Sequence, residues 1–286
     1  MIQDIVPHHF DNAYRPEPPE KNSIVLCYKD RSCFLRWTEE GIVFPTFEEM
    51  EGTGIKPYDS WTYLFSIDEE SYYLIPEQIT EDLIIKDDGT VNYYSFEEIN
   101  IFRFVDPQYR AFAGITGFQL HNWYRNHGFC GHCGKKMRPH EKERMMYCDS
   151  CGTMEYPKIT PAVIIAVTDG NRILLSKYAG RAFRKYALLA GYTEIGETAE
   201  ETVRREVMEE VGLRVKNIRY YKSQPWSFTE TLLMGFFCDL DGEDTITLDE
   251  DELALAEWFE REKIPVEPSR DSLTNEMIIT FKQGKI

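Results

Sequence analysis

Two Cys-x2-Cys pairs between residues 130 and 151 constrain the fold of this 286-residue chain more than any other feature. Each pair can present two thiolates to one ion from a tight turn, and a glycine follows the second cysteine, where the turn needs backbone freedom. Four thiolates suit a tetrahedral Zn²⁺ ion and leave no position open for chemistry, so the sequence predicts one structural zinc. A redox dithiol is the alternative for a single pair, but two pairs at this spacing without a βαβ pattern favour zinc. The predicted zinc ligands are Cys130, Cys133, Cys148 and Cys151.

The stretch around these cysteines, residues 126–157, is too short to fold on an apolar core of its own, so the metal is expected to stabilise it. It is also the most basic part of an acidic chain, which leaves two roles open: reading a nucleic acid, or serving as a structural spacer or dimerisation element. Its basic side chains are Lys135, Lys136, Arg138, Lys142 and Arg144. His132 and His140 are expected to be exposed, because four cysteines already fill the metal site.

A carboxylate-rich segment further along the chain is predicted to contain a helix with signals at both ends. Thr198 is the expected N-cap, Glu201 completes a capping box, and Gly212 is the expected C-terminal stop. An apolar stripe for the core follows the helical period. It consists of Val203, Val207 and Val211.

Three carboxylates of this helix, Glu206, Glu209 and Glu210, are three or four residues apart or adjacent and share one face. Like charges this close repel one another and raise one another's pKa. A solvated acidic face is one interpretation. The other is a site for a hard divalent cation such as Mg²⁺ or Mn²⁺, which prefers oxygen ligands.

The spacing of the whole segment decides between these interpretations. Gly191 is followed after five residues by Glu197 and after seven more by the run Arg205-Glu206-Val207-Met208-Glu209-Glu210-Val211-Gly212-Leu213. This resembles the Nudix box, Gx5Ex7REUxEExGU with U an aliphatic residue, at every fixed position. The resemblance implies a hydrolase of nucleoside diphosphates linked to another group, with a mixed sheet between helices and water as the nucleophile.

The same resemblance implies a role for each matching residue. Glu206 and Glu210 would be the chief metal ligands, and Glu209 a further ligand or the base that activates water. Arg205 would orient Glu197 or another carboxylate of the box by a charge-assisted hydrogen bond. Two metal positions outside these carboxylates are also implied. They are the backbone carbonyl of Ala190 and the side chain of Glu252.

Residues 223–231, SQPWSFTET, lie between two strand-like runs and are interpreted as a loop. They resemble SQPWPFPxS, the motif of the NADH pyrophosphatase subfamily of Nudix hydrolases, which also carries a zinc ribbon before the Nudix domain. Two prolines of the motif are replaced, by Ser227 and Thr229, and Thr231 replaces the final serine while it keeps a hydroxyl. The resemblance implies that this segment contacts the substrate. Its candidate residues are Gln224, Pro225, Trp226, Ser227, Phe228, Thr229, Glu230 and Thr231.

Further substrate contacts are implied outside that segment. Tyr156 and Tyr192 resemble the aromatic positions that sandwich the nicotinamide ring. Thr274 matches a position that lines the nicotinamide mononucleotide half, and Glu143 matches another contact position. The implied reaction is hydrolysis of NADH or NAD⁺ to nicotinamide mononucleotide, reduced or oxidised, and AMP. The alternatives are removal of NAD caps from RNA 5′ ends, a broader nucleoside-diphosphate-linked hydrolase, and a non-catalytic Nudix-like regulator, which the complete set of box carboxylates disfavours.

The order of apolar patterns predicts an α+β chain of three domains. Short aromatic-rich strands and a helix at 108–127 predict a β-rich N-terminal domain over residues 1–125. The zinc ribbon is expected at 126–157, and a Nudix α/β/α sandwich at 158–286.

The bulk properties exclude some classes of protein. A formal net charge of −17 argues against a general nucleic-acid or anionic-membrane binder, because such proteins need Lys and Arg to displace counterions. No apolar run is long enough for a membrane span, and the first residues lack the features of a secretory signal, so a cytoplasmic location is expected. The subfamily resemblance implies a homodimer.

Overall fold

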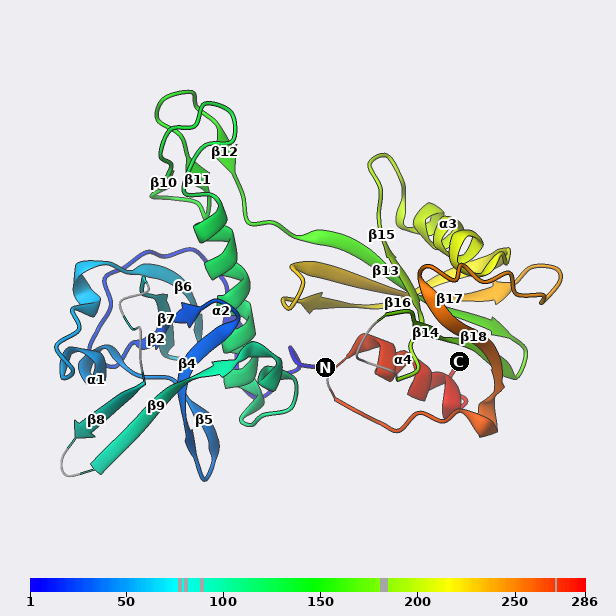
Figure 1. The fold of residues 1–286 in the computed structure, drawn as a ribbon, viewed down its shortest axis with the longest axis horizontal. Coiled ribbons are helices and arrows are strands. Elements are labelled where there is room, and N and C mark those ends of the chain that lie inside the picture. Colours follow the sequence, from blue (N-terminus) through cyan, green and yellow to red (C-terminus); the bar gives the residue numbers. More distant parts are fainter. Residues whose placement is uncertain (77–78, 80–81, 88–89, 181–184, 271) are drawn as a thin grey trace. The chain divides into compact units, whose positions relative to one another are not determined.

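The structure is a computed structural model that describes the chain except residues 77–78, 80–81, 88–89, 181–184 and 271; of residues 84–87, 90 and 91 it describes only the backbone (Figure 1). The contacts divide the chain into two compact units. The first unit contains residues 159–226 and 230–286 together with Met1, and the second contains residues 2–158 and 227–229. No helix of the described residues is both long and apolar enough to cross a membrane.

The second unit is rich in short strands, as the sequence predicts for its N-terminal part. One sheet has the order β1 (Phe10–Asp11), β6 (Thr62–Ile67), β7 (Glu70–Leu74) and β2 (Ile24–Leu26). Another has the order β3 (Tyr28–Lys29), β4 (Ser32–Thr38), β9 (Thr90–Glu98) and β8 (Leu83–Asp87), with β5 (Gly41–Val43) paired to β4. The short helical elements are α1 (Phe47–Glu51), η1 (Pro57–Asp59) and η2 (Ile99–Arg103).

The long helix of this unit, α2 (Gln108–Asn126), confirms the helix predicted at 108–127. It approaches η2 closely at Gly114, where a Cβ atom would lie 2.4 Å from the ring of Phe102. The hydroxyl of Tyr28 donates a hydrogen bond of 2.6 Å to the Gly114 carbonyl. Beyond α2, three short antiparallel strands form the ribbon: β10 (Arg138–Pro139), β11 (Met146–Tyr147) and β12 (Met154–Glu155).

The first unit is built on a six-stranded mixed sheet. Its order is β16 (Val215–Trp226), β17 (Thr231–Leu240), β13 (Thr160–Asp169), β14 (Arg172–Tyr178) and β18 (Leu253–Glu260), and β15 (Leu189–Tyr192) also pairs with β13. The β13–β17 pair is parallel and the other pairs are antiparallel. A 3₁₀ turn, η3 (Arg261–Lys263), follows β18.

Helices cover both faces of this sheet, as the central strand requires. Strand β13 is apolar at successive positions, so it needs a cover on each side. Val163, Ile165 and Val167 pack in one core with α3 (Ala199–Val211), and the alternate residues Ile164 and Ala166 pack in a second core with α4 (Leu273–Lys282). Figure 1 shows the two helices on opposite sides of the sheet. The predicted α/β/α sandwich is therefore confirmed.

The interpretation of residues 223–231 as a loop is wrong for its first half. Strand β16 continues to Trp226, which pairs with Thr231 of β17, so only residues 227–230 form the turn between the two strands. Strand β16 lies at the edge of the sheet. An edge strand tolerates Pro225, which has no N–H to donate, and this explains why a sequence that looks like a loop is extended here.

Candidate active site

The helix α3 that carries the box glutamates is held at both ends as its sequence predicts. The Thr198 hydroxyl accepts a hydrogen bond from the Glu201 N–H, and the Glu201 carboxylate accepts one of 2.8 Å from the Thr198 N–H, so the capping box is confirmed. Gly212 ends the helix with φ of 69°, in the left-handed region that glycine enters without strain. The predicted valine stripe is fully buried in the core. The helix is therefore fixed against the sheet, and Glu206 and Glu210 are buried on the side of the helix next to the valines.

Strand β15 brings its backbone directly against one of these glutamates. A Cβ atom at Gly191 would lie only 1.9 Å from the carboxyl carbon of Glu206, so a residue with a side chain does not fit there. The carboxyl group of Glu206 thus lies on the backbone beside Ala190 and Gly191. Burial raises the pKa of Glu206, and the Arg205 guanidinium opposes that shift.

Glu210 has the most unusual environment of the box residues. Its exposed fraction is 1%, and neither carboxylate oxygen has a hydrogen-bond partner of good geometry among the described residues. Burial, followed by the charges of Glu206 and Glu252, raises the pKa of Glu210 to about 8, and the Ala190 backbone amide offsets only part of this shift. A charged carboxylate in such a place is unfavourable unless a cation compensates it.

Arg205 ties the other box carboxylates together. Its guanidinium binds Glu197 through two nitrogens, Nε at 2.6 Å and Nη2 at 2.9 Å. Its Nη1 donates to Glu206 at 2.7 Å and to Glu209 at 2.9 Å, and its Nη2 also donates to the backbone carbonyl of Tyr192 at 2.9 Å. The bond from Arg205 is the largest cause that lowers the pKa of Glu197, to about 2.

These residues fit a divalent cation. The buried carboxylate of Glu210 has free lone pairs, and Glu206 lies beside it. Glu252 is exposed, just before β18, and its charge acts on both. Glu206 and Glu209 both accept hydrogen bonds from Arg205, which holds their carboxylates next to the same guanidinium. Oxygen ligands of this kind are those that Mg²⁺ and Mn²⁺ prefer.

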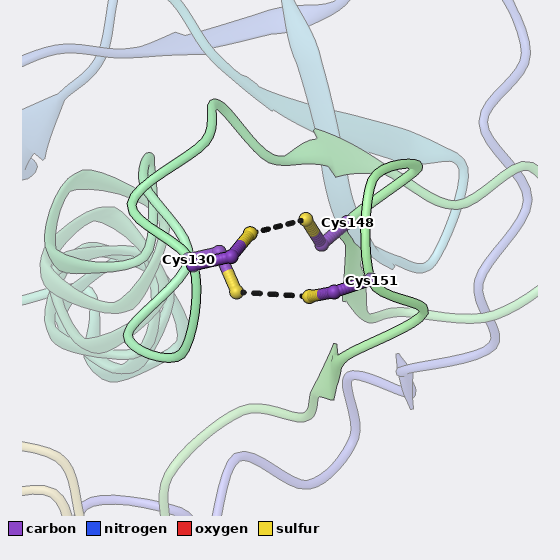
Figure 2. A group of neighbouring side chains, drawn as sticks. Cys130, Cys148 and Cys151 are labelled. Atoms are coloured by element: carbon purple, nitrogen blue, oxygen red, sulfur yellow. Dashed lines mark hydrogen bonds between the residues drawn. The ribbon is translucent and has the colours of Figure 1, made fainter.

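The four ribbon cysteines form a closed set. The sulfur atoms of Cys130 and Cys151 are 3.6 Å apart, and those of Cys133 and Cys148 are 3.5 Å apart. Figure 2 shows the side chains of Cys130, Cys148 and Cys151 pointing toward one another. All four sulfurs lie within 4.8 Å of one another. Tetrahedral bonds of about 2.3 Å to one zinc would place the sulfurs about 3.8 Å apart, close to these distances. The residues therefore fit one structural Zn²⁺.

The basic residues of the ribbon fall into two groups. Arg138 binds Asp149 through two nitrogens, at 2.8 and 2.9 Å, and Arg144 donates to Asn12 and lies over the ring of Tyr14. The side chains of Lys135, Lys136 and Lys142 are exposed. His132 is exposed as predicted, whereas the prediction of exposure is wrong for His140, which is half-buried because its backbone pairs with Met145 and accepts from the Tyr14 hydroxyl.

The predicted substrate residues of the first unit are not equally accessible. Tyr192 is half exposed, and Pro225 is exposed. Gln224 is fully buried, and its side-chain oxygen accepts a hydrogen bond of 2.7 Å from the Leu273 N–H at the start of α4. The other candidates are less accessible. Thr231 is buried, and Trp226, Glu230 and Thr274 are half-buried.

The remaining predicted substrate residues belong to the second unit. The Tyr156 hydroxyl donates a hydrogen bond of 2.9 Å to the Glu143 carboxylate, and both side chains are exposed. Tyr156 and Glu143 are therefore neighbours. In the sequence, only the family resemblance relates these two residues. The turn residues Ser227, Phe228 and Thr229 are also grouped with the second unit; Ser227 is buried, Phe228 is half-buried and Thr229 is exposed.

One residue of this network was not singled out from the sequence. Thr202 is fully buried on α3, and its hydroxyl lies 3.0 Å from the Glu197 carboxylate. It occupies one of the seven variable positions of the box, so the motif gives no signal for it. Its position one turn before Arg205 on the same helix is the sequence signal that would have found it.

Two family models match the chain. The "NUDIX domain" model matches residues 158–278, and the "NADH pyrophosphatase zinc ribbon domain" model matches residues 125–156. A protein named NAD-capped RNA hydrolase NudC, from Klebsiella pneumoniae subsp. pneumoniae, is 41% identical over 174 residues, which is 60% of this chain and 66% of that protein. A protein of the same name from Escherichia coli O17:K52:H18 is 40% identical over 209 residues, 73% of this chain and 76% of that protein.

The match thus spans just under two thirds of the length of the Klebsiella relative and more of the Escherichia one. Among solved structures, a NUDIX hydrolase from Nitrosomonas europaea is 25% identical with a TM-score of 0.47, over 54% of this chain and 90% of that one.

Proposed function

Because this chain belongs to the Nudix hydrolases that carry an NADH pyrophosphatase zinc ribbon, we propose that it hydrolyses the pyrophosphate bond of NAD(H). Water and NADH or NAD⁺ would give nicotinamide mononucleotide, reduced or oxidised, and AMP. The observation that carries the proposal is the Glu210 carboxylate, which is buried without a partner of good geometry among the described residues and lies beside Glu206. A site of this kind uses a cation to hold a pyrophosphate.

Each box residue has a role in this proposal. Glu206, Glu210, Glu252 and the Ala190 carbonyl would hold Mg²⁺ or Mn²⁺. The metal would neutralise the pyrophosphate, polarise the P–O bond and lower the pKa of bound water. Glu209, the most exposed of the box carboxylates held by Arg205, would accept the proton of the attacking water or bind a further metal.

Arg205 and Glu197 would act on the other residues without touching the bond. The two-nitrogen contact between them fixes the guanidinium, and the guanidinium in turn fixes Glu206 and Glu209. A charge that is held in a fixed position stabilises the transition state most where water is excluded and where no group has to reorganise during the reaction.

Substrate contacts outside the metal site are also part of the proposal, and each rests on the resemblance to the subfamily. Tyr192 has an exposed ring. Tyr156 also has an exposed ring, and its hydroxyl donates to the Glu143 carboxylate. The 224–231 segment and Thr274 would contact the mononucleotide. Gln224 of this segment is fully buried, and it accepts a hydrogen bond from the Leu273 N–H, so it would also support the start of α4.

Removal of NAD caps from RNA is the second candidate function. It is favoured by the names of the Klebsiella and Escherichia relatives and by the exposed Lys135, Lys136 and Lys142 of the ribbon. The net charge of −17 opposes a strong general affinity for RNA. A broader hydrolase of nucleoside-diphosphate derivatives is the third candidate, since Ser227 and Thr229 replace two prolines of the subfamily motif.

The cellular location, the oligomeric state and the domain limits are also part of the proposal. The ribbon cysteines bind zinc as thiolates, which supports the reducing cytoplasm as the location. Family membership supports a homodimer, which light scattering on the purified protein would test. The three domains proposed are 1–125, 126–157 and 158–286, close to the limits of the two matched family models.

A substrate panel tests the function. Purified protein with Mg²⁺ or Mn²⁺ would be given NADH, NAD⁺, NAD-capped RNA, ADP-ribose, FAD and diadenosine polyphosphates at matched concentration. The proposal expects the highest kcat/KM for NADH or NAD⁺. A higher value for capped RNA that falls steeply with salt would favour the second candidate. Rapid cleavage of ADP-ribose, FAD or diadenosine polyphosphates, with NADH, NAD⁺ and NAD-capped RNA left intact, would refute the first two candidate functions.

A further inference from the structure

Thr202 is a fully buried polar side chain next to the box carboxylates. Its hydroxyl lies 3.0 Å from Glu197 Oε2 and 3.1 Å from the Thr198 carbonyl, one turn earlier on α3. A threonine inside a helix ordinarily donates only to that carbonyl, so the second acceptor is specific to this site.

The direction of the bond to Glu197 follows from the chemistry of both groups. Carboxylate and carbonyl oxygens only accept, so the Thr202 hydroxyl donates its one proton, which Glu197 and the Thr198 carbonyl share. Glu197 Oε2 also receives the Glu194 N–H at 3.1 Å and Arg205 Nη2 at 2.9 Å, while Oε1 receives Arg205 Nε at 2.6 Å. Thr202 therefore supplies one of the four donors that fix the orientation of this carboxylate.

We propose that Thr202 is a positioning residue for the metal-binding carboxylates of the box. Its hydroxyl fixes Glu197, Glu197 fixes the Nε–Nη2 edge of the Arg205 guanidinium, and Nη1 of Arg205 fixes Glu206 and Glu209. This inference rests on the proposed function, because it assumes that the box holds a divalent cation. The role belongs to the hydroxyl rather than to the volume of the side chain.

The expected effect is moderate because Thr202 acts through two other residues. Outer residues that orient metal ligands change metal affinity by about tenfold to a hundredfold when they are lost. Glu197 keeps three donors without Thr202. The Thr202→Val variant, which keeps the volume and removes the hydroxyl, is therefore expected to weaken Mn²⁺ binding by about threefold to tenfold, at or below the lower end of that range.

The chain offers a matched control. Thr168, at the end of β13, is also buried, and its hydroxyl also lies near a backbone carbonyl, that of Cys238, and a carboxylate, that of Asp239. Thr168→Val makes the same chemical change away from the box. It is expected to lower Tm and to leave Mn²⁺ affinity unchanged.

The test measures Mn²⁺ binding to the zinc-loaded full chain by electron paramagnetic resonance. Binding at the box is defined as the part of the bound Mn²⁺ that the Glu210→Gln variant loses. Steady-state kcat and KM for NADH and the Tm are measured beside it. Thr202→Val should weaken Mn²⁺ binding and lower kcat at unchanged KM, and Thr202→Ser should restore both.

Wild-type Mn²⁺ affinity in Thr202→Val would overturn the proposal, as would failure of Thr202→Ser to restore it. An equal loss in Thr168→Val would also overturn it, because the effect would then follow stability alone. If the wild-type protein binds Mn²⁺ but leaves NADH intact, the proposed function fails, and the Mn²⁺ comparison still decides the role of Thr202.

Discussion

At the scale of one residue, Glu210 provides a buried carboxylate that fits a cation. It is almost fully buried, and neither of its oxygens has a hydrogen-bond partner of good geometry among the described residues. The sequence places this glutamate on the same helical face as Glu206, and the motif predicts both as ligands. Its burial could not be predicted from the sequence, because it depends on the packing of α3 against β15.

Glu210→Gln is expected to lower kcat by about a hundredfold or more, because the variant loses a charge where the reaction needs electrostatic stabilisation. The side chain keeps its size and no longer ionises, so the metal-free protein is expected to keep its fold, with a Tm at or above that of the wild type. Steady-state kinetics and thermal melting measure the two effects. Glu200→Gln, on the exposed side of the same helix, is the matched control and should retain activity. Full activity in Glu210→Gln would remove this residue from the mechanism.

The pH dependence of stability is a second consequence of the buried Glu210. Its pKa rises from 4.5 to about 8 on folding, so the folded chain keeps a proton that the unfolded chain releases. The stability from this group is fully present below pH 4.5 and is lost as the pH rises through about 8.

We therefore expect wild-type protein without added Mg²⁺ or Mn²⁺ to lose stability relative to Glu210→Gln between pH 5 and 8, a range that lies inside this window. Urea unfolding at several pH values measures the difference. Saturating Mn²⁺ should reduce the loss because the cation replaces the proton. A difference between the two proteins that does not change with pH would contradict this account.

At the scale of elements, most helices and strands of the first unit follow from the sequence. The capping box at Thr198, the stop at Gly212 and the continuous apolar run of β13 specify their elements by local chemistry. The extension of β16 through Trp226 was not predicted, because Gln-Pro-Trp looks like a loop unless the strand is known to lie at an edge. Edge position is a property of the assembled sheet.

Helix α3 depends on Arg205 as its link to the loop before it. Arg205→Lys keeps the charge but loses the planar two-nitrogen contact to Glu197, so Glu206 and Glu209 lose their common support. We expect kcat to fall by about tenfold to a hundredfold, as for other residues that orient metal ligands, with a smaller change in KM. Steady-state kinetics with NADH at saturating Mn²⁺ measures both constants.

The neighbouring exposed arginine provides the control for this prediction. Arg204 donates only to the Glu200 carbonyl on its own helix among its described hydrogen bonds, so Arg204→Lys should retain wild-type kcat. Equal losses in both variants would show that the helix needs arginine for its stability, and not Arg205 for the site.

At the scale of the whole molecule, the zinc ribbon and the Nudix sheet have separate sources of stability. The ribbon cysteines lie in the second unit, whereas the two cores on either face of the Nudix sheet belong to the first. The sequence predicts both modules from their spacing patterns. It could not show that the ribbon belongs to one compact unit with the N-terminal strands, since that depends on contacts such as Arg144 with Asn12.

Cys148→Ser is therefore expected to abolish binding of the one zinc ion and to destabilise the second unit, while the first unit keeps its fold. Metal analysis gives the zinc content, and hydrogen exchange reports protection in each unit separately. Cys238→Ala, at a buried cysteine of the first unit, should retain a full equivalent of zinc. Retained zinc in Cys148→Ser would show that the four cysteines do not act as one ligand set.

The measurement that tests the central claim most directly is the identity of the products formed from NADH in ¹⁸O-labelled water. We predict equal amounts of reduced nicotinamide mononucleotide and AMP, with one heavy oxygen in one of the two monophosphates. Formation should require added Mg²⁺ or Mn²⁺ and should be nearly absent in Glu210→Gln. Release of nicotinamide with ADP-ribose, or NADH that stays intact while another nucleoside diphosphate derivative is cleaved, would contradict the account.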